Sequence, residues 1–177
     1  MVADGETDLR LVPDLPLPAY AYIPGRTARL AAGHLPDLPF PHNSVRPEAW
    51  QDCVPFLYGI DLFNAGYWWE AHEVWEDLWQ ACGRNGVRAD FLKGLIALAA
   101  AGVKAAQGKP DGTDRHAVRA GHLFRQTQAA VHAPRGRYFG LSVDDLIGMA
   151  DELVARARAT APDDGDRFME RIVLSPA

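Results

Sequence analysis

Apolar residues recur every three or four positions through most of the chain after residue 47, which is the spacing of an amphipathic helix. Five stretches follow this period: from Pro47 to about Asn64, from Trp68 to about Cys82, from Phe91 to about Gln107, from Thr113 or Asp114 to about His132, and from Ser142 through Ala157. Pro55 lies inside the first stretch and is expected to kink or restart that helix. No stretch alternates polar and apolar residues convincingly enough to predict a sheet.

Glycine-containing turns separate the stretches, at Asn64–Gly66, Gly83–Gly86, Gly108–Gly112 and Ala133–Gly136. Short connections make neighbouring helices antiparallel, so the pattern predicts consecutive helical hairpins. We therefore predict an all-α fold, with about five main helices in a compact bundle that forms one domain over residues 47–177. The turn and helix over residues 64–78 are also similar to half of a tetratricopeptide hairpin. A related turn at 107–110 does not follow at the 34-residue spacing of tetratricopeptide repeats. The similarity therefore predicts helical-hairpin packing of this kind and no repeat array.

Residues 1–46 have a different composition, because most of the 13 prolines fall there or at Pro47. Proline removes amide donors and biases the preceding residue toward extended geometry, so neither a long helix nor a central strand is expected. The same segment holds too many leucines and aromatic residues for a solvated tail. We predict an extended, proline-rich arm that packs on the helical body.

The helix over residues 68–82 carries four of the five tryptophans. A helical wheel groups aromatic, small and aliphatic residues on one face, namely Trp68, Ala71, Trp75, Leu78 and Trp79. Three carboxylates gather on the other side and are expected to face solvent, namely Glu70, Glu73 and Asp77. The aromatic face is typical of a core or of a self-association interface, and Trp69 lies outside the main ridge, where a partner could cover it.

His72 and Glu76 do not join the other polar residues of this helix. They are one turn apart and lie between the tryptophan ridge and Trp69, so the pair faces an aromatic wall. One interpretation is a buried polar network, in which Glu76 accepts hydrogen bonds from His72, from an indole N–H or from Lys93. The other interpretation is catalytic, with His72 as general base, Glu76 orienting it and Lys93 stabilising negative charge.

A metal site is the third interpretation of this pair, because a histidine and a glutamate one turn apart can share one zinc, iron or manganese ion. The nearest further donors are Asp61, Glu73, His34 and His42, and none has a diagnostic spacing. We therefore predict no metal site and no cofactor, with a divalent metal as the alternative.

Ligand binding beside the pair would involve five residues of the same region, namely Asp61, Trp68, Trp69, Glu73 and Trp75. A separate basic group on a later helix is expected to be a solvated face rather than an anion site, and it consists of His116, Arg119, His122 and Arg125.

The net charge of −5 argues against a nucleic-acid partner, which would select a basic patch. Two cysteines without a CxxC spacing are expected to be reduced packing residues. The N-terminus does not have the pattern of a signal peptide, and the most apolar run is too short to span a bilayer. These features predict a cytoplasmic protein with no membrane partner.

Three blocks of the sequence resemble a known family. The run from Tyr58 to Trp79, YGIDLFNAGYWWEAHEVWEDLW, is similar to the signature of the bacterial and archaeal domain-of-unknown-function 309 family, and DFLKGLIALAA at 90–100 and GKPDG at 108–112 resemble its next blocks. The resemblance covers roughly residues 58–123. It implies an all-helical fold and an uncharacterised activity.

Two functions from different classes are consistent with these features. The leading prediction is a helical scaffold or binding module that forms a homo-oligomer and contains the His72–Glu76 network. The alternative is a small enzyme, possibly a metal-assisted hydrolase, centred on His72 and Glu76.

Overall fold

The computed structural model describes residues 10–40, 45–131, 136–159 and 173–177. Within these residues a short 3₁₀ helix, η1 (Pro47–Asp52), is followed by α1 (Val54–Asn64), α2 (Trp68–Ala81), α3 (Val87–Ala106), α4 (Pro110–Ala130) and α5 (Val143–Ala159). A two-stranded antiparallel hairpin, β1 (Arg137–Tyr138) and β2 (Leu141–Ser142), precedes α5. The predicted all-α fold is confirmed. The hairpin was not predicted, because two residues per strand are too few to show an alternating pattern.

Two helices begin earlier than the sequence pattern predicted. α3 starts at Val87, directly after Gly86, whose φ of +82° ends the preceding turn. Asp90 therefore lies in the first turn of α3 and is not its cap. α4 starts at Pro110, since the fixed φ of proline suits the first position of a helix. Pro55 restarts the chain as α1 after η1, as predicted.

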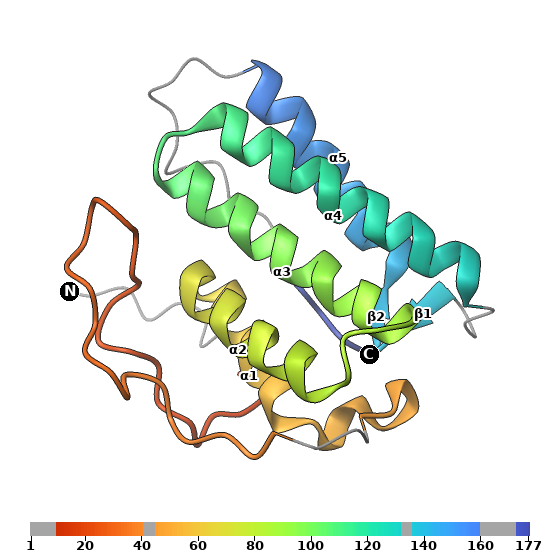
Figure 1. Cartoon of the computed structure of the whole chain (residues 1–177), viewed down its shortest axis with the longest axis horizontal. Helices are drawn as coiled ribbons and strands as arrows, with labels where there is room; N and C mark the ends of the chain where they lie inside the picture. Colours follow the sequence, from red (N-terminus) through yellow and green to blue (C-terminus); the bar gives the residue numbers. More distant parts are fainter. Residues whose placement is uncertain (1–9, 41–44, 132–135, 160–172) are drawn as a thin grey trace, which may run out of the picture.

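Consecutive helices pack against each other, with α3 between α2 and α4 and with α5 against α4 (Figure 1). α3 is buried almost all round, which is why its sequence is apolar on most faces. Gly94 lets Phe124 of α4 approach closely, because a Cβ at Gly94 would lie 2.5 Å from the Phe124 ring. Both cysteines are free and buried, and burial raises the pKa of the Cys53 thiol to about 11, so both pack as small apolar groups.

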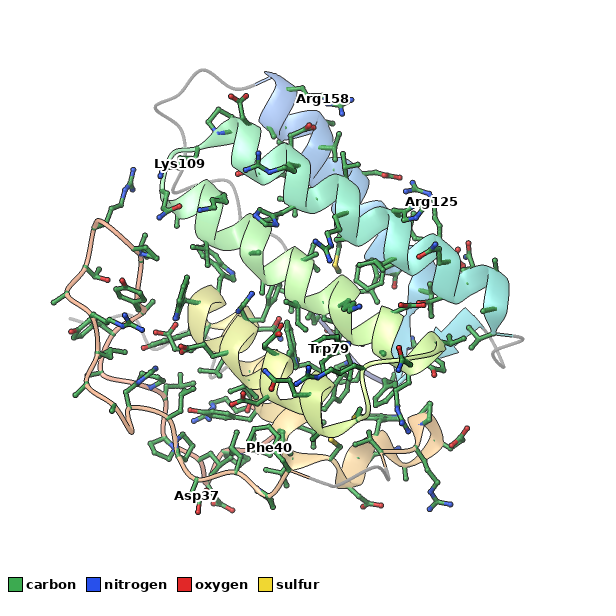
Figure 2. All side chains as sticks on the ribbon, viewed as in Figure 1. Asp37, Phe40, Trp79, Lys109, Arg125 and Arg158 are labelled. Atoms are coloured by element: carbon green, nitrogen blue, oxygen red, sulfur yellow. The ribbon has the colours of Figure 1, made fainter. Side chains whose placement is uncertain are left out.

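The arm lies along α1 and α2, and its side chains separate into inward and outward sets. Phe40 packs against the core, whereas Asp37 is exposed at the rim (Figure 2). Buried groups of the body bind the arm backbone. The Tyr58 hydroxyl donates to the Pro16 carbonyl at 2.7 Å, and Gln107 Nε2 donates to the Pro24 carbonyl at 2.7 Å. The predicted arm is therefore present.

The C-terminal end also packs back on the body. Leu174 is buried, and its amide and carbonyl both bond the side chain of Asn64, at 2.8 and 2.9 Å. Residues 160–172, which precede this end, lie outside the described residues. The predicted start of α5 is confirmed, because the Ser142 Oγ accepts the Asp145 amide at 3.2 Å.

Candidate functional site

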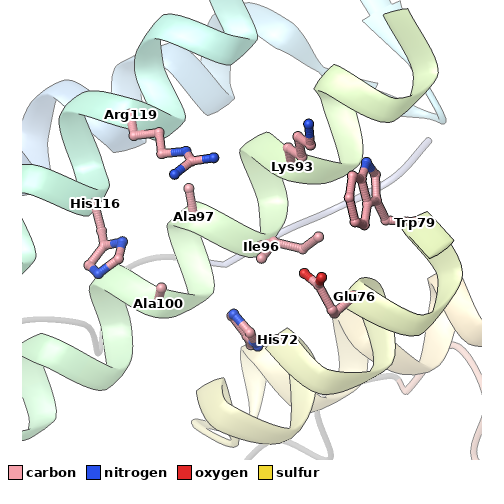
Figure 3. A pocket seen from close by; sticks show the side chains of 9 residues that line it. All are labelled: His72, Glu76, Trp79, Lys93, Ile96, Ala97, Ala100, His116 and Arg119. Atoms are coloured by element: carbon pink, nitrogen blue, oxygen red, sulfur yellow. The ribbon is translucent and has the colours of Figure 1, made fainter. Parts of the chain in front are cut away.

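A cavity of about 250 Å³ lies over α3, between α2 and α4 (Figure 3). Its lining residues are His72, Glu76 and Trp79 from α2, Lys93, Ile96, Ala97 and Ala100 from α3, and His116 and Arg119 from α4. The structure thus brings together all three residues that the sequence singled out for catalysis, His72, Glu76 and Lys93. It adds two basic residues from a helix that lies about forty positions later in the chain.

The helices place these side chains through simple spacing rules. His72 and Glu76 are one helical turn apart on α2 and point toward the same side, where α3 passes (Figure 3). The floor is formed by Ala97 and Ala100, whose small side chains leave the space that the polar groups surround. The cavity therefore has an apolar floor and polar walls.

The ring of His72 is half-buried and stacks against Trp69, with centroids 6.0 Å apart and planes 21° apart. Burial lowers the pKa of His72, and the nearby carboxylates of Glu76 and Glu73 oppose this effect. The balance favours a neutral imidazole at neutral pH. A neutral ring offers one N–H donor and one lone pair, as a general base or a ligand-binding group requires.

The basic residues of the cavity sit in different environments. The Lys93 ammonium lies 4.8 Å from the centroid of the Trp79 ring, a distance at which a cation is attracted to the aromatic face. Burial lowers the pKa of His116, and the charges of Arg115, Lys104 and Arg119 lower it further. Lys93 and Arg119 are consequently the fixed positive charges of the cavity at neutral pH.

The hydrogen bonds predicted for a buried network are not confirmed. Among the described residues, the side chains of His72, Glu76 and Lys93 form no hydrogen bond with one another, and those of His116 and Arg119 form none either. The indole nitrogen of Trp79 is buried and also lacks a partner within the described part of the chain. The five polar side chains that line the cavity therefore make no hydrogen bond to any residue that the structure describes.

None of the five residues predicted to bind a ligand lines this cavity. Trp75 is fully buried in the core, where its Nε1 donates to the Phe56 carbonyl at 3.4 Å. Trp68 is partly buried and packs against the same core. Trp69 lies between His72 and Tyr22 of the arm, whose ring meets it edge-on at 5.3 Å. Self-association through these aromatic residues stays a prediction.

Asp61, predicted to bind a ligand, instead binds the arm. Its Oδ1 accepts the Leu11 amide at 2.8 Å, and its Oδ2 accepts the Val12 amide at 3.0 Å and lies 3.5 Å from Arg10. Glu73, also in that set, lies 3.3 Å from His34 of the arm.

The prediction that Glu70 faces solvent is wrong, because Glu70 is fully buried. The arm covers that side of α2, and Glu70 Oε1 accepts the Tyr22 amide at 2.8 Å. A helical wheel describes one helix in isolation, so it could not show that the arm covers Glu70. Burial raises the pKa of the Glu70 carboxyl, and the hydrogen bond from Tyr22 partly offsets this.

His116 and Arg119 were predicted to lie on a solvated face. Arg119 is exposed and His116 is half-buried, and both also line the cavity. The sequence contained one usable signal, since the two residues are one turn apart on α4 and His116 borders the apolar face formed by Ala117 and Ala120. A helical wheel of α4 alone could not show that these two residues line a cavity shared with α2 and α3.

Within residues 10–40, 45–131, 136–159 and 173–177, no group of three or more His, Cys, Asp or Glu residues is arranged to hold a metal ion. His42, one of the candidate donors, lies outside the described residues. In the same part of the chain, the helices are all too short or too polar to cross a membrane.

Comparison with known proteins relates the helical body to a family without an assigned function. A search of curated proteins found no match. The family match begins in α1, contains the whole of α2 and α3, and ends in the first turns of α4, so it includes every cavity residue except His116 and Arg119. Residues 56–115 match the family model described as Domain of unknown function (DUF309), which confirms the resemblance of the Tyr58–Trp79 signature.

Proposed function

We propose that this chain is a binding module whose cavity between α2, α3 and α4 takes a small molecule with an anionic group. The observation that supports the proposal is the convergence of five polar side chains from three helices on one cavity, with no hydrogen bonds between them. These five side chains make no hydrogen bond to any described residue, so a ligand that bonds several of them at once can gain affinity.

The charge of the cavity selects the class of ligand. Lys93 and Arg119 supply two fixed positive charges, and Glu76 supplies one negative charge. The guanidinium of Arg119 can form paired hydrogen bonds to a phosphate, sulfate or carboxylate. Glu76 and neutral His72 can then accept hydrogen bonds from a hydroxyl or amine of the same molecule.

The size and apolar surfaces of the cavity limit the rest of the ligand. A volume of about 250 Å³ lies just below the range of about 300–1,000 Å³ that is usual for small-molecule sites. Ile96, Ala97 and Ala100 offer an apolar floor, and Trp79 offers a flat wall. A compact phosphate or carboxylate with a small apolar part fits these features.

The test is isothermal titration of the purified chain with phenyl phosphate, with benzyl alcohol as the uncharged comparison. We expect phenyl phosphate to bind and benzyl alcohol not to bind. Arg119→Gln is expected to weaken phenyl phosphate binding at least about tenfold, since a hydrogen bond to a charged group contributes about 1.5–3 kcal/mol.

The matched control is Arg115→Gln, which removes an exposed arginine one turn earlier on α4 that does not line the cavity. It should change the affinity less than twofold. Equal loss in both variants would mean that general surface charge attracts the anion, and it would contradict the proposed site.

A second function, acid–base catalysis on the bound anion, is favoured by the neutral state of His72 and the position of Glu76 one turn away. In this reaction a ring nitrogen of His72 accepts a proton from water while the water oxygen attacks an ester carbon or phosphorus, and the alcohol leaves with a proton from solvent. His72→Gln should then abolish hydrolysis of 4-nitrophenyl esters yet retain phenyl phosphate binding. Absence of hydrolysis by the parent chain would eliminate this second function and leave the binding proposal intact.

A further inference from the structure

A second cavity, of about 360 Å³, lies between the arm and α2. It is lined by Tyr22 and residues 29–34 of the arm and by Trp69 and Glu73 of α2. It shares no lining residue with the cavity over α3. Trp69 separates the two, because one side of its ring stacks on His72 while Tyr22 meets it edge-on.

Two aromatic rings form one corner of this second cavity. The Tyr22 and Trp69 planes are at 90°, with centroids 5.3 Å apart. The amide of Tyr22 is held at 2.8 Å by Glu70 Oε1, which fixes this point of the arm on α2. A positively charged group over an uncovered face of either ring is attracted to it, since the face of an aromatic ring is electron-rich.

Two hydrogen-bond acceptors face each other beside the aromatic corner. The Nδ1 of His34 is 3.1 Å from the Ala31 carbonyl, which can only accept, so Nδ1 carries a proton; in an imidazole whose single proton is on Nδ1, Nε2 has a lone pair. This Nε2 lies 3.3 Å from Glu73 Oε2. Both atoms are buried and make no hydrogen bond to any residue that the structure describes. A ligand that brings N–H donors to this point would satisfy both acceptors.

We propose that the cavity under the arm binds a small molecule with a primary ammonium group. The ammonium would donate to Glu73 and His34 and lie against the Tyr22–Trp69 corner, which combines a charge-assisted hydrogen bond with cation–π attraction. Arg29 lines the same cavity and is exposed at its rim, where it can pair with a carboxylate. The shared chemistry is the ammonium group, and its source is either a simple amine or an amino acid.

The test uses three probes of similar shape in isothermal titrations at pH 8, where an ordinary imidazole is neutral and a primary amine is charged. They are 2-phenylethylamine, its uncharged counterpart 2-phenylethanol, and phenylalanine. We expect the amine to bind at least about tenfold more tightly than the alcohol, because a hydrogen bond to a charged group contributes about 1.5–3 kcal/mol. Tighter binding of phenylalanine than of the amine, lost in Arg29→Gln, assigns the site to amino acids. Equal or weaker binding of phenylalanine assigns it to simple amines.

Glu73→Gln should reduce amine affinity at least about tenfold. The matched control is Asp77→Asn, which removes an exposed carboxylate one turn later on α2, outside the cavity, and should leave the affinity within twofold. If Glu73→Gln unfolds, His34→Leu provides the same test from the arm side. Equal binding of amine and alcohol, no binding of either, or equal losses in Glu73→Gln and Asp77→Asn would overturn the proposal. These results are independent of phenyl phosphate binding over α3.

Discussion

Replacing Asp61 with alanine tests how the arm is attached to the helical body. Asp61 is only 5% exposed, and its carboxylate accepts the amides of Leu11 and Val12 at 2.8 and 3.0 Å. The guanidinium of Arg10 lies 3.5 Å from the same carboxylate. One buried side chain of α1 thus holds three consecutive residues of the arm.

The loss of stability expected in Asp61→Ala can be estimated from these contacts. Hydrogen bonds to a charged group contribute about 1.5–3 kcal/mol each, so two of them set a ceiling of about 3–6 kcal/mol. The Arg10 contact adds at most about 1 kcal/mol, because the arginine is partly exposed and solvent screens it. The freed amides can bind water once this part of the arm loosens. We therefore expect Asp61→Ala to reduce the free energy of unfolding by about 2–4 kcal/mol.

The assay is urea denaturation together with hydrogen exchange at the Leu11 and Val12 amides. Asp61→Asn should lose about half as much stability, because it keeps one acceptor oxygen. Asp52→Ala, an exposed carboxylate at the end of η1, should lose less than about 0.5 kcal/mol. Unchanged stability in Asp61→Ala, with both amides still protected from exchange, would refute the anchoring role.

Further predictions concern helix packing and pH. Gly94→Ala should lower the free energy of unfolding by about 1–3 kcal/mol, since its new Cβ would meet the Phe124 ring at 2.5 Å. Gly148→Ala, on the open side of α5, should raise the free energy of unfolding by about 0.5–1 kcal/mol, and thermal melting compares the two variants. Burial lowers the pKa of His72 below its ordinary value near 6.5. The unfolded chain then binds more protons, so stability should fall as pH decreases below about 6.5, and His72→Gln should flatten this slope in urea titrations. Sulfate affinity, measured by calorimetry, should rise over the same interval as His72 and His116 gain charge, and an affinity independent of pH would exclude them from the site.

The helices were predictable from sequence because their apolar period is a local property. The restart at Pro55 and the end of α1 at Asn64, two residues before Gly66, also follow from local backbone chemistry. The early starts of α3 and α4 were missed because the predicted helices began at Phe91 and at Thr113 or Asp114. Val87 and Pro110 also fit the first turn of a helix.

The candidate site was only half predictable for a related reason. His72 and Glu76 stand out within one helix, and Lys93 was the nearest cation on the next helix. His116 and Arg119 come from α4. They lie near the α2 residues because α2 and α4 both pack on α3, and the sequence of α4 alone does not contain that information. The burial of Glu70 depends in the same way on the arm, which lies nearly fifty positions earlier in the chain.

The most direct test of the anion site is an NMR titration of the histidine ring protons with and without sulfate, which does not itself titrate near neutral pH. Bound sulfate should raise the pKa of His72 and His116, because an anion stabilises the charged imidazolium. His122, exposed on α4 and outside the cavity, is the internal control and should not respond. If His72 and His116 do not move, or if all three histidines shift together, the cavity over α3 is not the anion site.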